Sequence, residues 1–171
     1  MEVKEALLKR RSIRKFKEDK ISDEIIEELL IAAMSGPSAC NKRPWEFYVV
    51  TNEEKLKEVR KASLFSRFKA PLAIIVCGNL SKALPMQLST YWIQDASAAT
   101  ENILLRVTDL GLGACWVHRA RQMFESDEGK LLMKQWGLPE NMKGVGNCIL
   151  GYAAAEPLEK PRKDGRILKI G

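Results

Sequence analysis

Residues 91–117, YWIQDASAATENILLRVTDLGLGACWV, contain most of the longest regular pattern in the chain. From Leu88 to Leu110, apolar residues recur at steps of three and four, which predicts a long helix with one face in the core. These residues are Trp92, Ala96, Ala99, Ile103, Val107 and Leu110. Gly111 predicts the end of the helix, because glycine readily adopts the left-handed conformation that closes helices. The segment ACWVH at 114–118 then predicts a short strand.

Apolar runs on both sides of this stretch predict a small sheet. The run LAIIVCG at 72–78 is continuously apolar, as in a central strand that is covered on both faces. The segments WEFYVVT at 45–51 and VGNCILGY at 145–152 also have the composition of strands. Further helices are predicted at 2–9, after the N-cap residue Ser22, at 52–62 and at 126–136. Together these patterns predict one α+β domain over residues 1–171, with a small sheet around a long central helix and further helices packed on it.

The composition favours a folded protein of a reducing compartment. Of the 171 residues, 46% are hydrophobic and 29% are charged, a balance that is typical of a packed domain. The sequence has no apolar run of about 18 residues and no recognisable signal peptide, so we expect no membrane span. The four cysteines are far apart and form no CxxC pair. We therefore expect a cytoplasmic protein with neither a disulfide framework nor a zinc site.

A basic segment, KRRSIRK at 9–15, places five cations within seven residues. The net charge of the chain is +6, and residues 1–20 hold eight Lys and Arg against four Asp and Glu. Such a segment can bind the phosphates of nucleic acid, although no RNP, zinc-finger or helix-turn-helix signature accompanies it. Charge alone leaves four interpretations open: nucleic acid, an acidic membrane surface, a small phosphate ligand, or a solvated helix end.

Most catalytic constellations have no counterpart in this sequence. His118 is the single histidine, so a Ser-His-Asp or Cys-His device would have to include it. No GxGxxG follows the first strand, and the sequence contains no Walker loop, HExxH or EF-hand spacing. A hydrolase or a metalloenzyme is therefore poorly supported, and we expect no metal site. Any chemistry is expected to belong to a bound cofactor.

Four blocks of the chain resemble the FMN-dependent nitroreductase family, a family of NAD(P)H-dependent flavin oxidoreductases. They are RRSIRKF at 10–16, SGPSACNKRPWEFYVV at 35–50, the stretch at 91–117, and ILGYAAAEPLEKPRK at 149–163. The blocks come in the order of the family. The resemblance implies a nitroreductase-like fold with a central mixed or antiparallel sheet surrounded by helices. It also implies a homodimer with FMN bound tightly but non-covalently at each of two subunit interfaces.

For the FMN phosphate, the resemblance implies cations from both ends of the chain. Arg10, Ser12 and Arg14 alternate, so an extended segment would place all three on one side. Guanidinium groups offer the bidentate donors that suit a phosphate. The family pattern assigns to the phosphate and its ribityl chain Arg10, Ser12, Arg14, Lys160 and Arg162. It places Arg11 near the ring or the ribityl chain.

For the flavin ring, the resemblance implies a loop that reaches across the dimer to the flavin of the other subunit. The loop residues are Pro37, Ser38, Ala39 and Asn41. Arg43 stands where the family motif N-x-Q-P-W has glutamine. Near the N1–C2=O edge of the flavin, a guanidinium would favour the anionic reduced form. Contact with substrate and a place at the dimer surface are the alternatives.

The reactive edge of the ring, near N5, is expected to lie at Val117, His118 and Arg119. Relatives often have a small residue at the position of His118. This histidine either hydrogen-bonds the substrate or narrows the pocket, or it is a structural residue of the strand.

The reaction that the resemblance implies is ping-pong. NADH or NADPH passes a hydride to N5 of FMN and leaves, and a nitroaromatic, quinone or flavin acceptor then takes its place. Reductive dehalogenation and flavin breakdown by the same fold are alternatives, but such relatives usually carry an extra lid. Only NLSKALPMQL at 79–88 separates the strand at 72–78 from the long helix. The expected partners are a second copy of the chain and small-molecule acceptors, with no nucleic acid and no membrane.

Overall fold

The computed structural model describes residues 1–63, 68–85, 90–117, 120–157, 161, 165 and 167–170. In this part of the chain, four strands form one antiparallel sheet in the order β1-β2-β4-β3. The strands are β1 (Trp45–Val50), β2 (Leu72–Asn79), β3 (Gly113–Val117) and β4 (Met142–Gly151). All four agree with the strands that the apolar runs predict, and the last residue of the predicted strand at 114–118 lies outside the described residues.

Strand β2 lies inside the sheet, between β1 and β4, and every one of its residues is buried. Its side chains alternate between two cores, as the pleat of a strand requires. Ile74 and Val76 belong to one core, whereas Ile75 and Cys77 belong to the other. The continuous apolar run therefore forms a central strand that is covered on both faces, as the sequence predicts.

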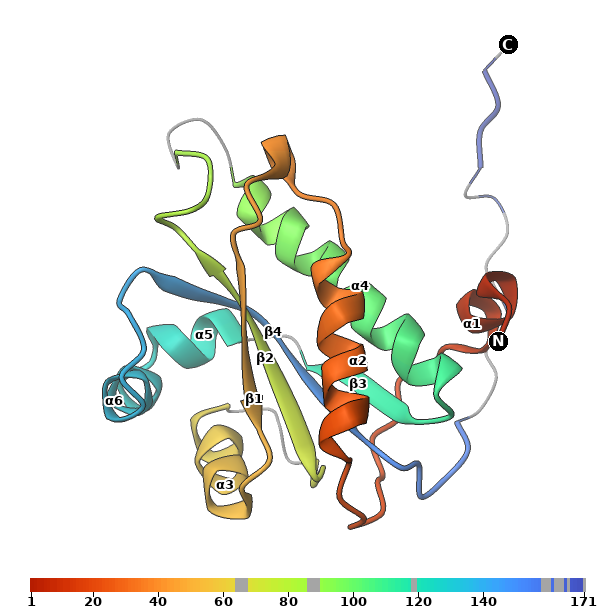
Figure 1. The fold of residues 1–171 in the computed structure, drawn as a ribbon, viewed down its shortest axis with the longest axis horizontal. Coiled ribbons are helices and arrows are strands. Elements are labelled where there is room, and N and C mark those ends of the chain that lie inside the picture. The colour runs from red at the N-terminus through yellow and green to blue at the C-terminus, as the bar shows by residue number, and fades with distance from the viewer. Residues whose placement is uncertain are drawn as a thin grey trace.

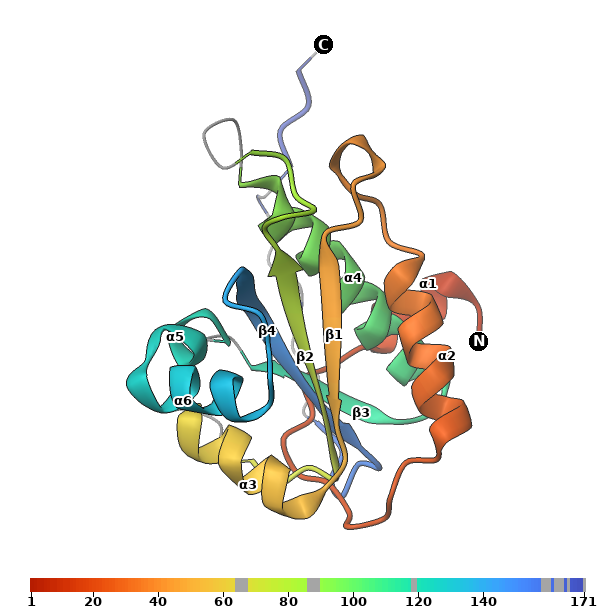
Figure 2. The same ribbon diagram turned by 60° about the vertical axis from the view of Figure 1, so that its left-hand side comes forward.

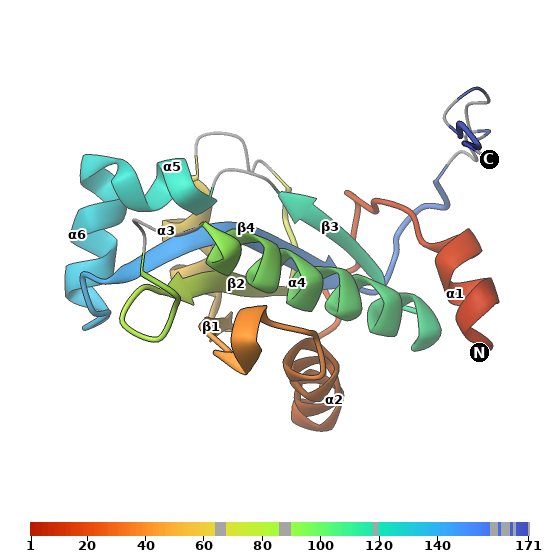
Figure 3. The same ribbon diagram turned by 90° about the horizontal axis from the view of Figure 1, so that it is seen from above.

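Two layers of helices cover the sheet (Figure 3). Helices α2 (Asp23–Met34) and α4 (Tyr91–Asp109) pack on one face. Helices α3 (Glu53–Ala62), α5 (Ala120–Glu125) and α6 (Asp127–Gln135) pack on the other. The sheet is thus surrounded by helices, as the resemblance implies. It does not wrap around the long helix, however, because α4 lies on one face only.

Helix α4 corresponds to the long helix that the apolar spacing predicts. It begins at Tyr91, and the expected first turn at Leu88 lies outside the described residues. Its apolar stripe is buried, and Gly111 follows it with a φ of 71°, the left-handed conformation expected of a helix end. Helix α1 (Val3–Lys9) lies near the C-terminal end of α4 (Figure 1), where the amino group of Met1 donates to Asp109 Oδ1 at 2.7 Å.

Helix α5 was not predicted from the sequence. Its buried residues, Ala120, Met123 and Phe124, follow helical spacing, but six residues are too few for a recognisable period. No helix among the described residues is long and apolar enough to cross a membrane.

Candidate functional site

The basic segment lies along the edge of the sheet. Residue Ser12 forms a parallel bridge with Ala114 of the edge strand β3, and the Ile13 N–H donates to the Ala114 carbonyl oxygen at 2.8 Å. The backbone is therefore held in place at this point by the sheet and does not trail as a free end. Ser12 and Arg14 are exposed on it.

The side chains of the predicted phosphate set contact different elements. Arg10 Nε lies 3.3 Å from Glu101 Oε1 of α4. Arg14 Nη1 donates to the carbonyl oxygen of Ser12 at 3.5 Å, and its guanidinium lies 6.0 Å from the centre of the Phe68 ring. Arg14 thus contacts the backbone of Ser12, while Arg10 is directed to α4. The three side chains therefore do not all lie on one side, as their alternation along an extended segment would predict.

Cys115 of β3 lies beneath this segment. Burial raises the pKa of its thiol, and the Arg14 guanidinium and the Ser12 hydroxyl act in the opposite direction. Both side chains are therefore close enough to β3 to influence a buried thiol. The bridge from Ser12 to Ala114 agrees with a place for Ser12 and Arg14 at the edge of the sheet.

Arg11 has a structural contact that the sequence did not suggest. Its Nη1 donates to the carbonyl oxygen of Leu8 at 2.7 Å and to that of Arg10 at 2.8 Å. These bonds satisfy carbonyl groups at the C-terminus of α1, where a cation is also favoured by the helix dipole. In this structure Arg11 caps α1.

The C-terminal tail starts beside the basic segment. The Ala154 N–H donates to the carbonyl oxygen of Lys15 at 2.9 Å. This pairing brings the start of the late sequence block next to the early one, as the predicted shared phosphate site requires. Lys160 and Arg162 themselves lie outside the described residues.

The loop predicted to contact the flavin ring has an unusual backbone. It contains the short helix η1 (Ala39–Asn41), and Cys40, Asn41 and Arg43 have φ values of 50°, 53° and 49°. For Cys40 and Arg43 this conformation costs about 1–2 kcal/mol each, whereas asparagine adopts it more readily. Such strain persists only where surrounding contacts hold it, and it is commonly found at functional loops.

Three of the predicted ring contacts form one cluster within this loop. The Arg43 N–H donates to Ser38 Oγ at 3.0 Å, and Arg43 Nε donates to Asn41 Oδ1 at 2.9 Å. Asn41 and Arg43 are exposed, as is Pro37. The loop therefore presents an amide and a guanidinium in a fixed relation to each other.

Two residues that sequence reasoning missed hold this loop. Asp95 Oδ1 of α4 accepts a hydrogen bond from the Ala39 N–H at 2.9 Å, and the Asn79 N–H donates to the Pro44 carbonyl oxygen at 2.6 Å. Asp95 is only 7% exposed. The sequence could have indicated this residue, because Asp95 is a carboxylate on the apolar face of the predicted helix.

Within one chain, the loop at 37–43 and the basic segment at 9–15 lie at different points along α4. Figures 1 and 2 show η1 beside the start of α4, whereas α1 and the segment that follows it lie toward the end of that helix. The contacts agree, since the loop bonds to Asp95 and Arg10 pairs with Glu101 farther along α4. Val117 is buried at the end of β3, and His118 and Arg119 lie outside the described residues.

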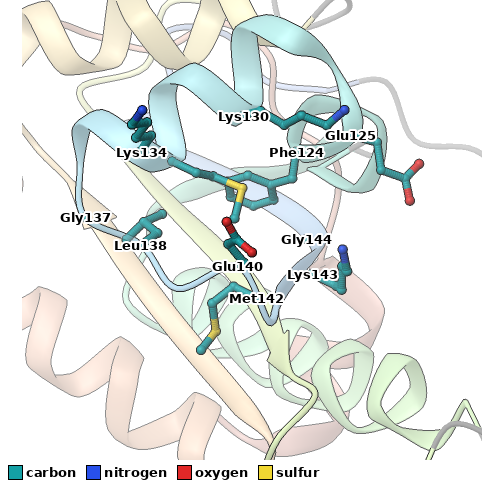
Figure 4. A pocket seen from close by; sticks show the side chains of 11 residues that line it. Phe124, Glu125, Lys130, Lys134, Gly137, Leu138, Glu140, Met142, Lys143 and Gly144 are labelled. Carbon is teal, nitrogen blue, oxygen red and sulfur yellow. The ribbon is translucent and has the colours of Figure 1, made fainter.

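A separate pocket of about 710 Å³ lies between α6 and the start of β4 (Figure 4). Phe124, Met133 and Met142 contribute apolar surface to it. Charges of both signs also line it, from Lys130, Lys134, Lys143, Glu125 and Glu140. Among the residues that the structure describes, none of the predicted flavin contacts lines this pocket. Because the lining carries both positive and negative side chains, it does not indicate whether a ligand would be an anion or a cation.

Comparison with known proteins decides the family. The sequence model of the nitroreductase family matches residues 7–71 and 67–152, which is more than half of the chain. The chain belongs to the nitroreductase family. The family and the fold expected from the four sequence blocks are thereby confirmed.

Relatives and solved structures agree with this nitroreductase assignment. A protein of Methanothermobacter thermautotrophicus, provisionally named an NADH dehydrogenase/NAD(P)H nitroreductase, is 38% identical over 92% of this chain and 80% of its own length. An FMN-dependent nitroreductase of Clostridium difficile has a TM-score of 0.78 and 32% identity, covering 95% of this chain and 92% of its own. A Bacteroides fragilis nitroreductase solved with bound FMN has a TM-score of 0.84 and 28% identity over the whole of both chains.

Proposed function

We propose that this nitroreductase is an FMN-dependent NAD(P)H oxidoreductase that reduces nitroaromatic, quinone or flavin acceptors. The observation that carries the proposal is the basic segment fixed on β3, with the start of the C-terminal tail beside it. A similar chain solved with FMN, the Bacteroides fragilis nitroreductase, supports the choice of cofactor.

The residues of this segment suit the phosphate end of FMN. The Arg14 guanidinium supplies a charged donor and the exposed Ser12 supplies a hydroxyl, and Arg10 is proposed to turn from Glu101 to the phosphate. Their backbone is held by the sheet, so a phosphate would meet donors whose main chain is already ordered. Lys160 and Arg162 are proposed to complete this set from the tail.

The ring end is proposed to come from a second copy of the chain. In one chain, the loop at 37–43 and the basic segment contact different parts of α4, through Asp95 and Glu101 respectively. A homodimer that joins the loop of one subunit to the basic segment of the other would complete the site.

Exposed apolar side chains support this homodimer. Val3 and Leu7 of α1 are 72% and 51% exposed, and Ile31 and Met34 of α2 are 54% and 52% exposed. Further exposed side chains belong to Tyr91, Ile167, Leu168 and Ile170. On each helix the two side chains are three or four positions apart and so share a face, which a second copy is proposed to cover.

When bound, FMN would accept a hydride from NADH or NADPH and deliver the electrons to the acceptor. The chain would then bind and orient the reactants, and no side-chain acid or base is required of it. We propose that Val117 and His118 line the reactive edge of the ring. The residues proposed to pack against the ring from the other subunit are Pro37, Ser38, Ala39, Asn41 and Arg43.

A cytoplasmic location is also proposed, and the free thiols of all four cysteines suit it.

The absorbance spectrum of the purified protein tests the function. We expect a yellow protein that binds one FMN per chain and oxidises NADH or NADPH when a nitroaromatic or quinone is added. Light scattering is expected to give the mass of a dimer. A halogenated phenol as acceptor tests the dehalogenation alternative in the same assay. A colourless protein that cannot be reconstituted with FMN would overturn the proposal.

A further inference from the structure

The flavin-contacting loop is joined to the rest of the fold on both sides of its strained residues. On one side the Ala39 N–H donates to Asp95 of α4, and on the other the Asn79 N–H donates to the carbonyl oxygen of Pro44. Between these bonds lie the left-handed residues Cys40, Asn41 and Arg43. The second bond is made by backbone atoms alone, whereas the first depends on the side chain of Asp95.

Asp95 is not needed to attach helix α2 to α4. Gly36, just after α2, lies directly against Ala99, where a Cβ on Gly36 would come 3.3 Å from the Ala99 nitrogen. Asn102 Nδ2 also donates to the Ala32 carbonyl oxygen at 3.1 Å. The two helices are therefore already joined by close packing and by a neutral amide. Asp95 supplies a hydrogen bond from α4 to η1 itself.

A carboxylate is a costly residue for this position. Asp95 is 7% exposed on the face of α4 that also carries the buried Trp92 and Ala99. Among the described residues no cation pairs with it. Burial of a charge without a cation is unfavourable, but an N–H that donates to a carboxylate makes a stronger bond than one that donates to a neutral oxygen. Burial of Asp95 therefore costs solvation energy, and in return its carboxylate holds the Ala39 backbone with a strong hydrogen bond.

We propose that Asp95 is a positioning residue that holds the loop at 38–43 in the shape that contacts the flavin. It acts through the Ala39 N–H and does not itself touch the cofactor. This inference rests on the proposed function, because it assigns the loop to FMN. In the homodimer, the carboxylate on α4 of one subunit thereby sets the environment of the flavin bound by the other.

The bond can be broken from either end. Asp95→Ala removes the acceptor. Ala39→Pro removes the donor, and Ser38 already has the extended conformation, with φ −143° and ψ 151°, that a residue before proline requires. Asp95→Asn keeps an oxygen that can accept the same bond. We expect each of the first two variants to weaken FMN binding about tenfold and to move the midpoint potential of bound FMN toward that of free FMN, and Asp95→Asn to restore most of both.

A matched control separates positioning from general stability. Thr100 is fully buried on the same helix, and its Oγ1 donates to the Ala96 carbonyl oxygen of that helix at 2.8 Å. Thr100→Val also removes one buried hydrogen bond and should leave FMN affinity and potential unchanged. Combining Asp95→Ala with Ala39→Pro should weaken binding no more than either change alone, because both break one bond.

The outcomes distinguish this inference from the proposed function. If the unaltered protein binds no FMN, the proposed function fails. If it binds FMN but Ala39→Pro and Asp95→Ala keep its affinity and potential, the positioning role of Asp95 is wrong and the function stands. Should Asp95→Ala fail to fold, Ala39→Pro compared with Ala39→Gly, which alters the same ring contact but keeps the N–H, provides the test without altering α4.

Discussion

Arg43 occupies the position where the nitroreductase motif has glutamine, and its contacts give the guanidinium a defined direction. Its Nε donates to Asn41 Oδ1, and its backbone is left-handed with a φ of 49°. This conformation costs about 1–2 kcal/mol and is sustained by the bond from its N–H to Ser38 Oγ. A cation held in this way can act on the charge of a reduced flavin, whereas a glutamine could offer only a dipole.

Replacing Arg43 with the glutamine of the family tests that effect. If the guanidinium stabilises the reduced flavin by about 1.4 kcal/mol, Arg43→Gln should make the midpoint potential about 30 mV more negative. Anaerobic redox titration measures this shift. Lys42→Gln, which removes the neighbouring exposed cation, is the control. An equal shift in both variants would show that net charge, and not the position of Arg43, sets the potential.

The phosphate assignment can be tested with a charge-matched pair of variants. Arg10→Ala with Arg14→Ala should weaken FMN affinity by at least about a hundredfold, because each charged hydrogen bond contributes about 1.5–3 kcal/mol. Lys9→Ala with Lys15→Ala removes the same charge from the same segment and should change affinity little. Fluorescence titration of FMN with apoprotein compares the two. Similar losses in both pairs would mean that the segment attracts FMN by charge alone.

At the scale of elements, the sequence predicted the long and strongly periodic segments well. Helix α4 and the apolar strand β2 follow directly from their spacing. Helix α5 was missed because it is shorter than two turns. The site was predicted through family resemblance. The bond from the Ala39 N–H to Asp95 was not predicted, because a carboxylate on the apolar face of a helix signals a buried partner without identifying it. Likewise, nothing in RRSIR indicated that Arg10 would pair with Glu101 of α4 or that Arg11 would cap α1.

The packing of α5 on β4 leads to a prediction about stability. Gly144 has no room for a side chain, since a Cβ there would come 2.4 Å from Phe124 Cδ2 and 2.5 Å from the Ala120 carbonyl oxygen. Gly144→Ala should therefore lower the free energy of unfolding by about 1–3 kcal/mol. Chemical denaturation measures this change, with Lys143→Ala on the same strand as control. Unchanged stability in Gly144→Ala would contradict the close packing of α5.

At the scale of the whole molecule, the proposed homodimer implies that one chain holds two half-sites. The basic segment lies on the edge strand β3, and the strained loop lies beside the start of α4 (Figure 1). A site assembled from two copies explains why both halves are exposed in one chain. It also predicts that each half can be inactivated in a different subunit and that the intact halves will combine.

Subunit mixing is the most direct test of this claim. One variant carries Arg10→Ala and Arg14→Ala, and the other carries Asn41→Ala and Arg43→Ala. Each is assayed at an FMN concentration that saturates the wild-type protein but leaves the variant alone largely without FMN, so that each has little activity alone. After unfolding and refolding together in equal amounts, random dimers should regain about a quarter of the wild-type sites, because half of the dimers are mixed and each holds one intact site. The readout is acceptor-dependent oxidation of NADH with FMN present. Recovery near a quarter of wild-type activity is the predicted result, and a mixture no more active than its two parents would contradict a site shared between subunits.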